Sequence, residues 1–268
     1  MFTLGRKVDI HYPTNRLIAI IAILITGVGY FLTRDFSIAW KMGASVFLTW
    51  ALTREIDPKR EYAAFVSVFF ALSSLLVVFK VDLLVVFFLL LALRYVSKIT
   101  GNENTILDML TLFGIAVFLS YSGKTSVYIL VLLFALFFNM RNRKSSKMDL
   151  IFFILSIVAL LAQIFILEGY ILPIPLLSGN WIMNTCAISL LVFIIFIIID
   201  KDKSILDDKG EIVNSNQILN AQIFFATTMS LLFLLTRVEI GNVIVYFASM
   251  WGYIFYGAIS MLKNKKSR

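Results

Sequence analysis

The sequence has few of the residues that build disulfide frameworks and metal centres. It contains one cysteine, Cys186, and one histidine, His11. A single thiol excludes an intramolecular disulfide, and zinc, haem and iron–sulfur sites need several His or Cys ligands. A Ser–His–Asp catalytic triad would have to use His11, which lies in the polar N-terminal tail, so we do not expect one. We therefore expect no metal ion and no cofactor, and we interpret Cys186, within an apolar run, as a small buried hydrophobic residue.

Charged residues are also scarce. They make up 15% of the 268 residues, whereas 60% are hydrophobic and the mean hydropathy is +0.92. Soluble domains contain about 25% charged residues. The apolar runs are continuous and do not alternate as the strands of a membrane barrel do. The composition therefore predicts an all-α, polytopic transmembrane helical bundle that forms a single integral membrane domain over residues 1–268 in the lipid bilayer.

Ten apolar runs have, or come close to, the length of about 20 residues that a membrane-spanning helix needs. Their predicted bounds are Leu17–Thr33, Phe36–Thr53, Tyr62–Phe79, Leu83–Val96, Thr105–Tyr121, Ser126–Met140, Leu150–Leu167, Trp181–Ile199, Ile218–Thr236 and Asn242–Leu262. The fourth and sixth runs are short. One hairpin, 62–96 or 105–140, could therefore be only partly inserted, which would leave eight spans with the same orientation.

Basic residues are distributed unevenly over the connections between the runs. If the N-terminus is inside, the inside segments hold 19 Lys and Arg, and the outside segments hold only Arg34, Lys80, Lys124 and Arg237. Cytoplasmic loops carry such an excess. We therefore predict a multi-pass plasma-membrane protein with cytoplasmic tails at 1–16 and 263–268. The net charge of +8 is dispersed over short segments and forms no continuous basic face, so no nucleic-acid partner is expected.

The densest charged segment connects the second and third runs. Its charged residues are Arg54, Glu55, Asp57, Lys59, Arg60 and Glu61. The arginines suit a phosphorylated head group, and the carboxylates suit a divalent cation. A structural interpretation is equally concrete: Asp57 would be the N-cap and Pro58 the first-turn proline of the third helix. The basic residues would then be ordinary cytoplasmic anchors.

A second polar segment follows the fourth run. Thr105-x-x-Asp108 predicts a capping box at the start of the fifth helix, and Gly101 predicts a stop after the fourth. Arg94 lies two residues before the end of its apolar run, so it either snorkels to the interface or pairs with an acid of a neighbouring loop. The candidate polar site on the cytoplasmic face comprises Arg54, Glu55, Asp57, Arg60, Arg94, Lys98, Glu103 and Asp108.

A third polar segment spans Asp200 to Glu211. It begins like a calcium-binding loop, but Ile205 occupies the sixth position, where such a loop needs glycine. We interpret it as a solvated acidic loop that turns at residues 208–210. Weak binding of magnesium beside a phosphate substrate is the alternative.

The sequence leaves three functions open. No Asp or Glu lies near the middle of a run, which disfavours coupling to protons or sodium, so the leading prediction is an uncoupled transporter or translocator of a small or amphipathic solute or lipid. The second is an assembly or anchoring subunit of a homodimer or membrane complex, which uses its cytoplasmic loops to bind a partner. Ala248 and Gly252 offer a small-residue pair for close helix packing in a dimer. The third, and less favoured, is an enzyme acting on a lipid or prenyl substrate.

Overall fold

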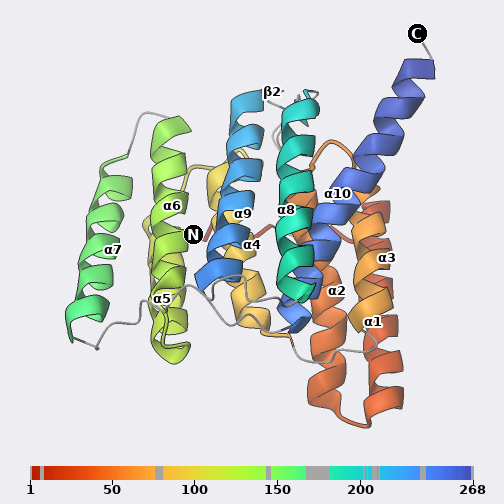
Figure 1. The fold of residues 1–268 in the computed structure, drawn as a ribbon, viewed down its shortest axis with the longest axis horizontal. Coiled ribbons are helices and arrows are strands. Elements are labelled where there is room, and N and C mark those ends of the chain that lie inside the picture. The colour runs from red at the N-terminus through yellow and green to blue at the C-terminus, as the bar shows by residue number, and fades with distance from the viewer. Residues whose placement is uncertain are drawn as a thin grey trace. The chain divides into compact units, whose positions relative to one another are not determined.

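A computed structural model describes residues 2–6, 9–75, 81–142, 146–166, 181–201, 203, 205–206, 210, 212–235 and 240–266. Within these residues the protein is all-helical, with one pair of two-residue strands as the exception (Figure 1). The ten helices are α1 Pro13–Thr33, α2 Phe36–Ile56, α3 Ala63–Leu75, α4 Leu83–Ser97, α5 Ile106–Ser122, α6 Val127–Asn142, α7 Lys147–Ile166, α8 Trp181–Ile199, α9 Ser215–Leu235 and α10 Ile240–Lys266.

Each described helix overlaps one of the ten predicted apolar runs. Four of the helices, α1, α7, α9 and α10, are long and apolar enough to cross a membrane. The helices α3 to α6 are shorter, with 13 to 17 residues. Only 11% of the most apolar stretch of α1, and 22% of that of α7, is buried inside the protein. Apolar helices that leave most of their surface uncovered are typical of membrane proteins.

Local side-chain contacts fix several helix ends. Pro13 lies in the first turn of α1, and Arg34 ends that helix in the left-handed conformation, with φ 57°. The Asp35 carboxylate accepts hydrogen bonds from two backbone N–H groups in the first turn of α2. The predicted capping box of Thr105 and Asp108 is confirmed at the start of α5.

Two predicted helix boundaries are wrong in detail. Asp57 is the C-cap of α2 and not the N-cap of α3, which begins six residues later at Ala63. The reason is that the Asp57 carboxylate pairs with the side chain of Arg60 and does not cap a helix. The first left-handed residue after α4 is Lys98, with φ 49°, whereas Gly101, with φ 65°, follows three residues later.

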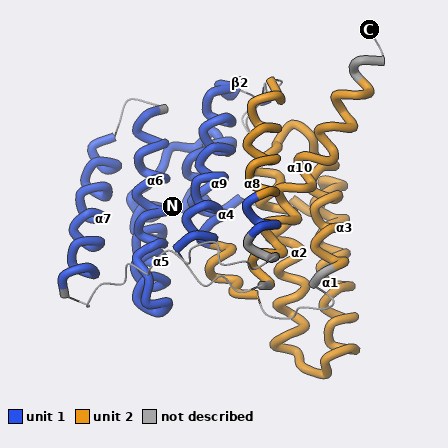
Figure 2. Tube along the Cα trace, in the orientation of Figure 1, with its two compact units in different colours: residues 1–6, 88–187, 203–237 blue, residues 7–87, 188–202, 238–268 orange. Residues whose placement is uncertain are grey.

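The described residues form two compact units, which Figure 2 shows in different colours. Unit 1 comprises Met1–Arg6, Phe88–Ala187 and Lys203–Arg237, and unit 2 comprises Lys7–Phe87, Ile188–Asp202 and Val238–Arg268. In unit 1, α6 contacts α5, α7 and α9. In unit 2, α1 packs on α2, and α2, α3 and α10 contact one another. The single integral membrane domain stays a prediction.

Glycines mark two close helix crossings in unit 2. A Cβ added at Gly43 would lie 2.5 Å from the Ala22 carbonyl oxygen of α1, and one added at Gly252 would lie 2.8 Å from the backbone nitrogen of Ser67 in α3. Glycine therefore permits close backbone approach at both crossings. Aromatic rings meet between helices in both units, as Phe138 of α6 and Phe224 of α9 do at 6.2 Å in unit 1 and Phe70 of α3 and Phe255 of α10 do at 6.0 Å in unit 2.

The segment after α8 contains the two short strands of unit 1. Ile205–Leu206 (β1) pairs antiparallel with Ile212–Val213 (β2). Val213 packs in a small core with Ile99 and Ile218. The interpretation as a solvated loop is therefore wrong for Ile205 and Val213, which pack on this core, whereas Ile212 is 82% exposed. The predicted turn at 208–210 lies outside the described residues, except for Gly210.

Candidate functional site

The eight predicted site residues are divided equally between the units, with Arg54, Glu55, Asp57 and Arg60 in unit 2. Arg54 Nη1 lies 2.9 Å from Glu61 Oε1, and its guanidinium lies 5.6 Å from the ring centre of Trp50. Tyr12 donates a 2.6 Å hydrogen bond to the same Glu61 oxygen. This hydrogen bond raises the pKa of Tyr12. Glu61 is thus engaged by two side chains at once.

The strongest polar arrangement in unit 2 surrounds Arg60. Arg60 Nε donates a 2.7 Å hydrogen bond to Asp57 Oδ2, and its Nη2 donates to Oδ2 of Asp200, the first residue after α8. The Tyr253 hydroxyl of α10 donates to that Asp200 oxygen at 3.0 Å. We call Asp57, Arg60, Asp200 and Tyr253 the Arg60 cluster. It joins the α2–α3 connection to α8 and α10.

The Arg60 cluster is held between aromatic rings and a glycine. The Arg60 guanidinium lies 5.4 Å from the ring centre of Tyr253, whose ring also packs against Phe193 and Phe196 of α8. A Cβ at Gly257 would come within 2.8 Å of Arg60 Nη1 and 2.7 Å of the Phe196 ring. The observed position of the Arg60 side chain therefore depends on glycine at position 257.

Burial controls the ionisation of the Arg60 cluster. The exposed fractions of Asp57 and Asp200 are 4% and 3%. Burial raises the pKa of Asp57 to about 6, and attraction to Arg60 offsets this only in part. Burial alone would lower the pKa of Arg60, but the two carboxylates outweigh it and raise that pKa above its usual value. Arg60 therefore remains a cation, and Asp57 can titrate near neutral pH.

Sequence reasoning placed Asp57 and Arg60 in the candidate site but missed their partners. Asp200 was assigned to a solvated loop, although it is buried. Tyr253 lies within the predicted run Asn242–Leu262, for which no charged partner was predicted. One signal was present: Asp200 follows Ile199 directly at the end of an apolar run, which is an expensive place for an unpaired carboxylate.

The other four predicted residues, Arg94, Lys98, Glu103 and Asp108, belong to unit 1. There the N-terminal segment docks onto Asp108, whose carboxylate accepts hydrogen bonds from the backbone N–H groups of Thr3 (2.7 Å) and Leu4 (3.1 Å). The Thr3 hydroxyl lies 2.6 Å from Asp108 Oδ2 and 3.1 Å from the Glu103 carbonyl oxygen, and Arg94 donates to the Leu4 carbonyl oxygen at 3.2 Å. These contacts fasten the start of the chain to α4 and α5.

A second buried acid lies in unit 1, at a position that the sequence analysis did not single out. Asp149, in the first turn of α7, accepts hydrogen bonds from the Tyr95 hydroxyl (2.6 Å) and the Asn139 amide (3.1 Å). Asn139 also donates to the Tyr95 oxygen at 2.8 Å. We call these three residues the Asp149 cluster. It links α4, α6 and α7 through neutral donors, and Lys98 lies 6.0 Å from the Tyr95 ring centre.

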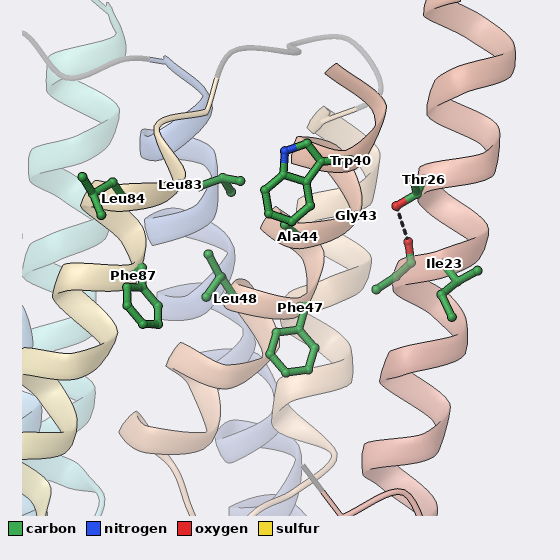
Figure 3. Close-up of a pocket in the computed structure, with 11 residues that line it drawn as sticks. Ile23, Thr26, Trp40, Gly43, Ala44, Phe47, Leu48, Leu83, Leu84 and Phe87 are labelled. Carbon is green, nitrogen blue, oxygen red and sulfur yellow. Dashed lines mark hydrogen bonds between the residues drawn. The ribbon is translucent and has the colours of Figure 1, made fainter. Parts of the chain in front are cut away.

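Unit 2 also contains an apolar pocket. Its volume is about 610 Å³, and α2 side chains stand between residues of α1 and the first turns of α4 (Figure 3). The lining residues are Ala22, Ile23, Thr26, Trp40, Gly43, Ala44, Phe47, Leu48, Leu83, Leu84 and Phe87. The Thr26 hydroxyl is turned to its own helix, where it donates to the Ala22 carbonyl oxygen at 2.9 Å. The pocket therefore suits a hydrocarbon chain better than a polar solute.

The described ranges bring no three His, Cys, Asp or Glu side chains together in a way that could hold a metal ion. The carboxylates proposed for a divalent cation are instead engaged by cations of the protein: Asp57 by Arg60, and Glu61 by Arg54. No known protein family, curated protein or solved structure matches the chain.

Proposed function

We propose that the protein is a translocator of an amphipathic solute or lipid, and that the hydrocarbon part of this substrate occupies the apolar pocket of unit 2. The pocket carries the proposal. Its volume of about 610 Å³ falls within the range of about 300–1,000 Å³ that is typical of small-molecule sites. Its lining of aliphatic and aromatic side chains offers dispersion contacts to an acyl or prenyl chain.

The proposed topology has ten spans in the plasma membrane and both termini in the cytoplasm. The excess of Lys and Arg in alternate connections supports it. In this orientation α2 enters from the outside at Phe36, and its pocket residues extend from Trp40, near the outer end, to Leu48, just past the middle of the helix. The Arg60 cluster then lies at the inner end, because Gly43 and Asp57 are about 20 Å apart along a helix that rises about 1.5 Å per residue.

The position of Trp40 supports a lipid-like substrate. It lies in the first turns of α2 and lines the pocket with an exposed fraction of 50%. Tryptophan is enriched at membrane–water interfaces, where its ring contacts hydrocarbon and its N–H faces polar groups. In the proposed orientation Trp40 lies at the outer interface. A substrate would thus place its chain against Phe47 and Leu48 and its polar end near Trp40.

The test is mass spectrometry of the full-length protein purified from its native membrane in mild detergent. We expect one lipid or amphipathic metabolite class to be retained. Ala44→Phe, which fills the pocket, should lose that ligand. Gly114→Phe is the matched control, because it adds the same ring where a Cβ meets no atom within 4 Å.

Other outcomes of this experiment would contradict the proposal. Equal retention of the ligand by both variants would show that the pocket does not hold it. Recovery of a stoichiometric protein partner without any specific lipid would favour the assembly-subunit alternative. The purified chain should behave as a folded species in both variants, which circular dichroism and size-exclusion chromatography would check.

A further inference from the structure

The formal charges of the Arg60 cluster do not balance. Two carboxylates, Asp57 and Asp200, contact the single guanidinium of Arg60. When both acids are ionised, the cluster carries one uncompensated negative charge in a site where both carboxylates are almost fully buried. Such a charge is costly in a low-dielectric environment unless it is neutralised.

The charged and titratable groups that face Asp57 come from three elements. Arg60 lies on the same α2–α3 connection, Asp200 lies at the end of α8, and Tyr253 lies on α10. The Asp200 charge repels a charge on Asp57, and the attraction of Arg60 is shared between the two acids. One cation therefore cannot satisfy both carboxylates. Among the residues that the structure describes, Arg60 alone brings a positive charge into contact with these two negative charges.

We propose that the Arg60 cluster is a binding site for one proton, which Asp57 takes up from the water phase at this end of the helices. One O–H bond forms on the Asp57 carboxylate as the bond that held the proton to hydronium or a buffer acid breaks, and the formal charge of the cluster changes from −1 to 0. The site adds proton binding to the protein independently of the proposed translocation. The sequence disfavoured coupling to protons because no Asp or Glu lies near the middle of a span. A proton site at the end of the spans removes that reason.

The hydrogen bonds favour Asp57 over Asp200 as the acid that takes the proton. Asp200 Oδ2 accepts from both Arg60 and the Tyr253 hydroxyl. Asp57 Oδ1 accepts only a long, 3.4 Å hydrogen bond from the backbone N–H of Arg60. Hydrogen bonds to a carboxylate stabilise its ionised form, so the less engaged acid holds the proton more tightly.

Proton binding would change the contacts between three helices. Ionised Asp57 attracts Arg60 toward the α2–α3 connection, and protonated Asp57 leaves the guanidinium to Asp200 alone. The glycine at position 257 leaves room beside the Arg60 Nη1 atom, where a methyl group would come within 2.8 Å. Proton binding therefore alters the contacts by which the α2–α3 connection is joined to α8 and α10.

The test is infrared difference spectroscopy of the purified full-length protein between about pH 8 and about pH 5, a window that brackets a carboxyl with a raised pKa. We expect the C=O band of one buried protonated carboxyl group to grow with a midpoint of about 6. Asp57→Asn should lose this band. Asp35→Asn is the control, because Asp35 is exposed and asparagine can also cap a helix.

A second variant keeps the test decisive if Asp57→Asn does not fold. Asp200→Asn leaves Asp57 and Arg60 as a one-to-one pair, so the midpoint of the Asp57 band should fall by about one pH unit or more. Persistence of an unchanged band in both Asp57→Asn and Asp200→Asn would overturn the proposal. Absence of any such band from the wild-type protein would do the same.

Discussion

The two units bury their acids in different ways. In unit 1, Asp149 accepts hydrogen bonds from the neutral side chains of Tyr95 and Asn139. In unit 2, Asp57 and Asp200 contact one guanidinium. Neutral donors stabilise a carboxylate without adding charge, so the Asp149 cluster serves to fix the positions of three helices. A cation shared by two acids leaves an imbalance that a proton can correct.

The contrast extends to helix packing. Unit 2 uses glycines where backbones approach closely, whereas Gly114 of unit 1 faces open space. Close crossings leave little freedom to the neighbouring helices, because packed interiors resist changes of even one methyl group. The same unit contains the apolar pocket and the Arg60 cluster. We therefore assign the proposed functions to unit 2 and a supporting role to the polar cluster of unit 1.

The largest expected effect comes from removing the shared cation. Arg60→Leu leaves two buried carboxylates without their guanidinium, which should destabilise the protein by about 3–5 kcal/mol. Thermal unfolding in detergent would measure the loss. Lys201→Leu is the control, since Lys201 is exposed and follows the cluster directly. Adding Asp57→Asn and Asp200→Asn to Arg60→Leu should recover part of the stability. An unchanged unfolding temperature in Arg60→Leu would contradict the comparison.

Stability should also depend on pH through Asp57. Its pKa is raised in the folded state from 3.8 to about 6, so its contribution is fully present below about pH 4 and is lost as the pH rises through about 6. The protein should lose about 2 kcal/mol from this group between about pH 4 and about pH 7. Unfolding curves at several pH values would show it, and Asp57→Asn should remove this component. A pH profile identical in wild type and variant would refute it.

Gly252→Ala tests the close crossing of α3 and α10. The added Cβ would lie 1.8 Å from Ser67 Oγ and 2.8 Å from the Ser67 backbone nitrogen, so the backbones must separate. We expect destabilisation of roughly 1–3 kcal/mol, as for other overpacked sites. Gly114→Ala should be neutral or slightly stabilising, because no atom lies within 4 Å of its Cβ and alanine favours helix. Equal effects at both glycines would remove the packing contrast between the units.

Tyr95→Phe should have the smallest effect of the four. It removes one donor from Asp149 but leaves the Asn139 hydrogen bond in place. A hydrogen bond to a charged group contributes about 1.5–3 kcal/mol, and we expect a loss near about 1.5 kcal/mol. Tyr121→Phe, at an exposed position, is the matched control. A loss as large as that of Arg60→Leu would show that the two clusters do not differ as described.

The apolar pattern was sufficient to predict every described helix, because continuous hydrophobic runs reveal helices locally. The capping box at Thr105 was also readable, since its two residues are three positions apart. The pairing of Arg60 with Asp200 spans 140 residues, and that of Tyr95 with Asp149 spans 54. Such pairings depend on how helices pack, which a single sequence does not specify. Asp57 was misassigned as an N-cap although its partner Arg60 lies only three residues away, because the pairing of Arg60 with the distant Asp200 depends on the same helix packing.

The most direct test of the central claim is a lipid-translocation assay with the full-length protein in phospholipid vesicles. A phospholipid with a fluorescent NBD head group, added to both leaflets, is reduced by external dithionite only when it reaches the outer leaflet. We predict that wild-type protein and Gly114→Phe expose the inner-leaflet probe. Ala44→Phe should slow this step by about tenfold, equivalent to about 1.4 kcal/mol in the barrier. Wild-type vesicles that behave like protein-free vesicles, or equal rates in Ala44→Phe and Gly114→Phe, would contradict it.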